Sequence, residues 1–123
     1  MSDEIVRLMS EYSADVTEAT KRAVNETSAE AVKDLKRTSP RRESTGGAYA
    51  KSWTRKKTEE TKTGLWNVIY NRQHYRLTHL LEFGHANARG GGRTPAHPHI
   101  ASAEARANDL LSEKTKEYIN DIS

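Results

Sequence analysis

The chain has 123 residues, of which 34% are hydrophobic and 30% are charged, and its formal net charge is +3. This length supports a single domain over residues 1–123, and the low apolar content allows only a thin core. The sequence contains no cysteine, which excludes disulfides and thiolate metal sites. No apolar run approaches the roughly 18 residues of a membrane span, so we expect a protein made and used in a cytoplasm, with no membrane partner.

The first 36 residues predict one long amphipathic helix over residues 3–36. Its apolar residues recur every three or four positions, apart from a polar gap around Thr27, and so form one stripe along the helix. The stripe is rich in alanine, which permits close approach to a sheet or to a neighbouring subunit. Its members are Ile5, Leu8, Tyr12, Val16, Ala19, Ala23, Ala31 and Leu35.

The middle of the chain carries the positive charge, because residues 37–76 contain ten basic and three acidic residues. Residues 38–48 have the composition of a loop, which we expect to be mobile. A concentrated basic segment can attract phosphate backbones or an acidic protein surface, although a solvated loop and an exposed strand face would account for it too. The basic contact surface that we expect consists of Arg37, Arg41, Arg42, Lys51, Arg55, Lys56 and Lys57.

Two segments that are rich in aromatic and β-branched residues, 49–57 and 64–71, predict an antiparallel hairpin around a polar connector. We expect both tryptophans, Trp53 and Trp66, to pack in the core against the long helix. Residues 73–83 predict a short helix that ends at Gly84, where a positive φ costs nothing.

The last third of the chain predicts a loop followed by a helix. We expect a second mobile loop at about 86–96, extended chain over 95–100, where prolines disfavour helix, and an amphipathic helix from Ser102 onward. The predicted fold class is therefore α+β: a small antiparallel sheet packed by a long N-terminal helix, a short middle helix and a C-terminal helix.

Several chemical functions can be weighed against the residues. His97 and His99 lie two apart on an extended segment and could bind a metal ion together with His79, His85 or Glu82, but histidines that hydrogen-bond or stack at an interface are commoner. No Gly-x-Ser-x-Gly motif is present, and the glycine run 90–92 lacks the Gly-Lys-Ser/Thr ending of a phosphate-binding loop. We therefore expect no catalytic residue, no metal and no cofactor. A small basic nucleic-acid-binding protein remains the alternative function, since Tyr49 and Trp53 are interleaved with the basic residues.

The order of the motifs resembles a known family. The chain has a Thr-Gly segment at 45–49, a Leu-Glu-Phe-Gly element at 81–84, and then a glycine-rich loop before the Pro-His-Ile segment that leads into the last helix. In this it is similar to the tail-completion, or neck, proteins of siphovirus-type long-tailed bacteriophages. Ser102 stands where that family often has proline at the helix start, and the spacing around Pro95 is irregular.

The resemblance implies a structural virion protein, assembled in the host cytoplasm, that forms a ring and joins the DNA-filled capsid connector to the tail. The implied partners are other copies of the chain, portal, adaptor or stopper proteins, tail terminator or tail-tube proteins, and DNA in the lumen through non-specific contacts. The sites that we expect are then an interface or a fold signature, formed by Glu82, Phe83, Gly84, His97, Pro98, His99 and Ile100.

Overall fold

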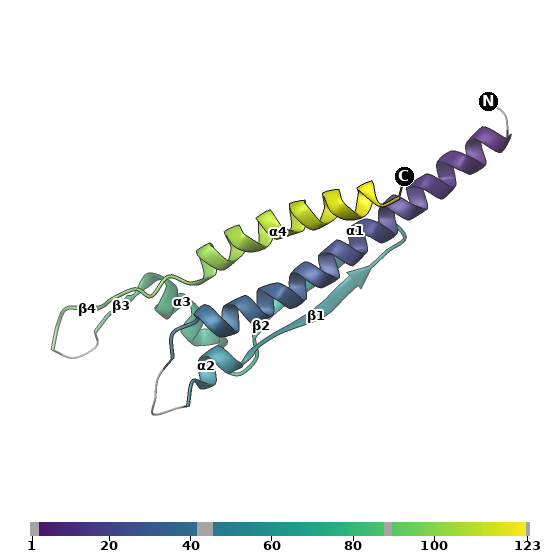
Figure 1. Ribbon diagram of the computed structural model, residues 1–123. Coiled ribbons are helices and arrows are strands. Elements are labelled where there is room, and N and C mark those ends of the chain that lie inside the picture. Colours follow the sequence, from purple (N-terminus) through teal and green to yellow (C-terminus); the bar gives the residue numbers. More distant parts are fainter. Residues whose placement is uncertain (1–2, 42–45, 88–89, 123) are drawn as a thin grey trace.

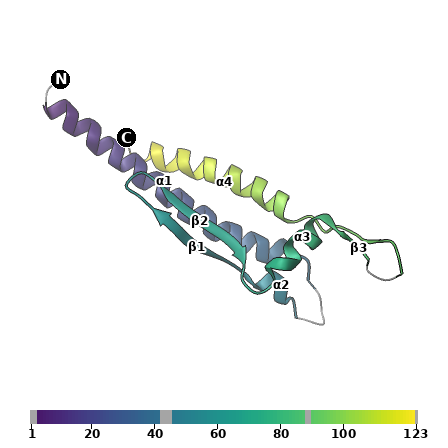
Figure 2. The same ribbon diagram turned by 180° about the vertical axis from the view of Figure 1, so that it is seen from behind.

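The computed structural model describes residues 3–41, 46–87 and 90–122, with side chains from residue 13 onward. A long helix, α1, has the C-terminal helix α4 packed antiparallel along one side and the β1–β2 hairpin along another (Figure 1, Figure 2). The predicted α+β fold class is confirmed. In chain order the elements are α1 (Asp3–Thr38), α2 (Ala48–Lys51), β1 (Trp53–Glu60), β2 (Leu65–Asn71), α3 (Tyr75–Phe83), β3 (His85–Ala86), β4 (Arg93–Thr94) and α4 (Ile100–Asn120).

The interface between α1 and α4 is built on small side chains and divides into two apolar clusters. Ala19 and Ala23 of α1 pack against Tyr118 near the end of α4. Towards the other end of α1, Leu35 packs against Ala103 together with Tyr49 and Trp53. Between the clusters lie buried polar residues, Thr27 and Ser28, and Glu26, which accepts a hydrogen bond from the Tyr118 hydroxyl and pairs with Lys114. The polar gap of the sequence therefore separates two small cores.

The hairpin differs from its prediction at the start of the first strand. Residues 48–51 form one helical turn, α2, which follows Gly47 at φ 75°; here the Ser52 hydroxyl donates to the carbonyl of Ala48. The strand prediction for residues 49–52 was therefore wrong. A single turn buries the adjacent residues Tyr49 and Ala50 together, whereas a strand would place them on opposite faces. From Trp53 onward the two strands pair antiparallel, with an irregularity between Lys57 and Glu59.

The two tryptophans have different environments. Trp53 is buried, as predicted, but Trp66 is 51% exposed and its core prediction was wrong. On β2, Asn67 faces α1 and donates to Ser28, and the next residue but one, Ile69, packs on the core. Strand alternation then turns Trp66 and Val68 to the outer face of the hairpin.

The last part of the chain follows the prediction with small shifts in boundaries. The middle helix begins at Tyr75 instead of residue 73, and α4 begins at Ile100, two residues before the predicted start. Gly84 ends α3 with φ 71°, as expected of its position. The predicted mobile loops include residues 42–45 and 88–89, which lie outside the described residues, and the mobility of these loops stays a prediction. None of the described helices is long and apolar enough to cross a membrane.

Candidate functional site

Glu82 joins α3 to the beginning of α4. Its carboxylate accepts hydrogen bonds from the backbone N–H groups of His99 and Ile100 through Oε1, at 2.6 and 2.8 Å, and from that of Ala101 through Oε2, at 3.0 Å. The first N–H groups of a helix have no partner within the helix, so Glu82 supplies the cap that the start of α4 otherwise lacks. The side chain is 7% exposed.

The protonation of Glu82 follows from this geometry. Burial alone raises the pKa of the carboxyl group, whereas the three backbone hydrogen bonds lower it, and the net result is a pKa below the ordinary value. The carboxylate form is thus the form that the fold stabilises, and it also suits the positive end of the α4 dipole.

His99 extends this cap into an aromatic cluster. Its Nδ1 lies 2.8 Å from the carbonyl oxygen of His97, which can only accept, so we assign the ring proton to Nδ1. Its Nε2 lies 2.8 Å from the hydroxyl of Tyr49, which therefore donates. Burial raises the pKa of Tyr49, and the indole Nε1 of Trp53 donates to the Ser39 hydroxyl at 2.8 Å. Together these bonds connect the end of α1 with α2, β1, α3 and α4.

The other residues of the predicted signature divide into two groups. Gly84 is buried, and a Cβ at this position would lie 2.7 Å from the carbonyl oxygen of Thr94. Ile100 packs on the core. Phe83, by contrast, is 64% exposed, and His97 and Pro98 are exposed as well, with the His97 backbone donating to the carbonyl of Leu81 at 2.6 Å. One part of the signature therefore holds α3, the β4 loop and α4 together, and the other part faces solvent.

The histidines considered above as metal ligands do not converge on a common site in the described structure. His99 uses both ring nitrogens in buried hydrogen bonds. Across residues 3–41, 46–87 and 90–122, no three His, Cys, Asp or Glu side chains gather as metal ligands would.

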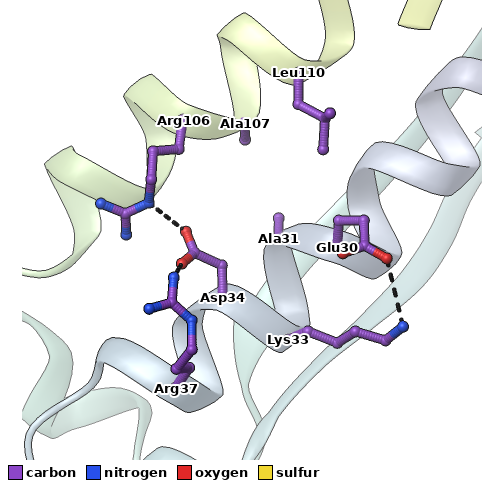
Figure 3. A pocket seen from close by; sticks show the side chains of 8 residues that line it. All are labelled: Glu30, Ala31, Lys33, Asp34, Arg37, Arg106, Ala107 and Leu110. Atoms are coloured by element: carbon purple, nitrogen blue, oxygen red, sulfur yellow. Dashed lines mark hydrogen bonds and ion pairs between the residues drawn. The ribbon is translucent and has the colours of Figure 1, made fainter.

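The predicted basic contact surface is largely engaged within the molecule. Arg37 pairs with Asp34 at 2.6 Å, and Arg106 of α4 pairs with the same carboxylate at 2.7 Å (Figure 3). Arg41 donates to the carbonyl of Lys36. On the hairpin, Arg55 donates to the carbonyl of Asn25 and Lys57 pairs with Glu60, while the Lys56 ammonium lies over the Tyr70 ring. Lys51 lies at the end of α2, and Arg42 lies outside the described residues.

A set of exposed apolar side chains was missed by the sequence reasoning. It occupies the outer face of β2 and much of α3, and consists of Trp66, Val68, Tyr75, Leu77, Leu80 and Phe83. Exposed large apolar side chains are candidates for interaction surfaces. The sequence carried no signal for this arrangement, because strand alternation would ordinarily place the polar Asn67 on the solvent face and Trp66 and Val68 on the core face. Only the hydrogen bond from Asn67 to Ser28 of α1 reveals the opposite orientation.

Comparison with known proteins identifies a family. Residues 3–84, which span α1 to the end of α3, match the family model HK97-gp10_like, described as "Bacteriophage HK97-gp10, putative tail-component". Neither the curated proteins nor the solved structures gave a match. Since the match covers well over half of the chain, the protein belongs to the HK97-gp10-like family of bacteriophage tail components, whose place is the virion.

Proposed function

We propose that this tail component is a neck subunit, which forms a ring of identical copies and joins the capsid connector to the tail. The role is structural and includes no catalytic step. The partners would be further copies of the chain, the portal, adaptor or stopper proteins on the head side, and the terminator or tail-tube proteins on the tail side.

The observation that carries the proposal is the set of exposed apolar side chains on a chain with so small a core. Trp66 and Phe83 are each more than half exposed, whereas the two apolar clusters contain only seven buried residues in the described part of the chain. Exposing large apolar groups is unfavourable in an isolated molecule. A ring subunit buries them against its neighbours through heterologous contacts, which close when each subunit offers two different surfaces.

The shape of the molecule supports the same role. The N-terminal part of α1 extends beyond the end of α4 and beyond the turn of the hairpin (Figure 1). A projecting helix of this kind is completed by packing on another molecule, because helical stability in proteins comes mostly from tertiary contacts.

The proposal is tested by complementation of a phage that carries an amber mutation in this gene. Without the protein we expect DNA-filled heads and separate tails, and normal infectious particles would refute the neck role. The double variant Trp66→Ala, Val68→Ala should fail to restore plaques, because it removes the apolar outer face of the hairpin.

A matched control tests whether the effect is specific to the outer face of the hairpin. The double variant Glu113→Ala, Lys116→Ala changes two exposed residues of α4 and should complement like the wild type. Both variants should retain the helical circular dichroism of the wild type, since none of the four side chains lies in the core. Equal complementation by the two variants would show that the outer face of the hairpin is not the interface.

A further inference from the structure

A hollow at the α2 end of the molecule collects cations from three elements. It has a volume of about 510 Å³, and the cations that line it are Lys36 of α1, Lys51 of α2 and Arg72, which follows β2. These residues are far apart in sequence, and only Lys51 belongs to the basic contact surface predicted from the sequence. We call them the cationic hollow.

The fold fixes this convergence through backbone and core contacts. The N–H of Arg72 donates to the carbonyl of Ser52 at 2.8 Å, so Arg72 lies opposite the residue that follows α2. Trp53 then ties this end of the hairpin to α1 through its bond to Ser39, which lies one turn beyond Lys36. The three cations therefore line the same hollow as a consequence of the hairpin register and the Trp53 anchor.

Among the described residues, no carboxylate compensates the charges of the hollow. The side chains of Lys36, Lys51 and Arg72 form no ion pair or hydrogen bond within the described part of the chain, and none of the described lining residues is a carboxylate. Several cations outside the hollow are neutralised by carboxylates. Arg37 and Arg106 share Asp34 in the pocket between α1 and α4 (Figure 3), and Lys21 and Lys57 share Glu60. Like charges gathered without counter-charges repel one another, and a bound anion would relieve that repulsion.

The rest of the lining indicates the class of anion. Thr54 and Gln73 add a hydroxyl and an amide donor, which are common partners of phosphate oxygens. Protein interfaces are depleted of lysine and depend on buried apolar anchors, and the exposed apolar residues of this molecule lie on the outer face of β2 and on α3. Trp53 is buried and presents no free ring face on which a base could stack.

We propose that the cationic hollow, through Lys36, Lys51 and Arg72, binds the phosphodiester backbone of nucleic acid without reading its bases. A polyanion of this kind is held by counterion release and requires no apolar contact. This binding deepens the proposed neck role, which implies non-specific contact with DNA but assigns no residues to it. It does not depend on ring assembly, so a purified protein can be tested whether or not the complementation experiment succeeds.

The probe is a fluorescein-labelled 30-bp DNA duplex of random sequence, with binding followed by fluorescence anisotropy between 50 and 200 mM NaCl. Each phosphate contact contributes roughly 0.9 to the slope of log K against log salt. The variant Lys36→Gln, Lys51→Gln, Arg72→Gln should therefore lower the slope by about 2–3 and weaken binding at 100 mM salt by about tenfold or more. The matched control, Lys62→Gln, Arg93→Gln, Lys116→Gln, removes the same charge from exposed positions outside the hollow and should keep the wild-type slope.

Competition distinguishes phosphate from other polyanions. Inorganic polyphosphate should displace the duplex at a lower charge concentration than poly-glutamate does. The proposal is overturned if the wild type shows no salt-dependent binding, if both triple variants lose the same slope, or if poly-glutamate competes as well as polyphosphate. Circular dichroism and the thermal midpoint of each variant show that a lost slope does not come from unfolding.

Discussion

Replacement of Glu82 by alanine tests whether the start of α4 is held by one carboxylate. The substitution removes three hydrogen bonds from backbone N–H groups at 2.6, 2.8 and 3.0 Å. It leaves these N–H groups in a site where the glutamate is 7% exposed, so water can replace the carboxylate only in part. The variant also removes a negative charge beside the N-terminus of α4.

The magnitude follows from the number and type of these bonds. A hydrogen bond to a charged group contributes about 1.5–3 kcal/mol, but the three share one carboxylate and are not additive. We expect a loss of about 3–5 kcal/mol in the free energy of unfolding, comparable to the loss of one partner from a buried ion pair. Domains typically have a free energy of unfolding of about 5–15 kcal/mol, so the expected loss is a large part of the total stability. The thermal midpoint should fall by about 10–15 °C.

The assay is urea denaturation at pH 7, followed by the fluorescence of Trp53, which contacts the His99 ring edge to face. The matched control is Glu104→Ala, which removes a carboxylate from an exposed position on the same helix and should change the free energy by less than about 0.5 kcal/mol. If Glu82→Ala cost no more than Glu104→Ala, the capping role of Glu82 would be wrong.

Two further predictions concern the same region. Because the pKa of Glu82 is lower in the folded chain than in the unfolded chain, its stabilisation is complete well above the unfolded pKa of about 4.3 and is lost as the pH falls through the folded value. The stability gap between wild type and Glu82→Gln, measured by urea denaturation from pH 7 to pH 3, should therefore narrow on acidification; a constant gap would refute the ionised cap. Gly84→Ala should destabilise by about 2–3 kcal/mol, since φ is 71° and the new Cβ would meet the Thr94 carbonyl oxygen. Gly46→Ala, at a glycine that has positive φ but open space around it, should cost about 1–2 kcal/mol. Both costs are measured by urea denaturation, and equal costs would contradict the steric argument.

Much of the fold could be predicted because it depends on local pattern. The spacing of Ala19, Ala23 and Leu35 identified the buried stripe of α1, and all three are buried. The prediction for the start of the first strand was wrong. The alternation around Tyr49 is typical of a strand, but Gly46 and Gly47 adopt positive φ and lead into a helical turn that buries Tyr49 and Ala50 together.

The site was harder to predict because its contacts are long-range. The Glu82 carboxylate accepts from N–H groups 17 to 19 positions later, and no periodicity specifies such a pairing. The basic residues also could not all be sorted from sequence into engaged and free ones. Arg55 reaches the carbonyl of Asn25 only because the hairpin packs on α1, whereas Arg37–Asp34 and Lys57–Glu60 are local pairs three residues apart.

The connection between α3 and α4 has an evolutionary consequence. The His97 N–H donates to the carbonyl of Leu81, Glu82 accepts from the first N–H groups of α4, and Gly84 lies close to the Thr94 carbonyl. The two ends of the segment that contains β3 and β4 are therefore held together. Doubling the length of a flexible loop between fixed ends adds only about 0.6 kcal/mol to the free energy of loop closure. Relatives could thus differ in the length and sequence of this connection while the scaffold that carries it stays unchanged.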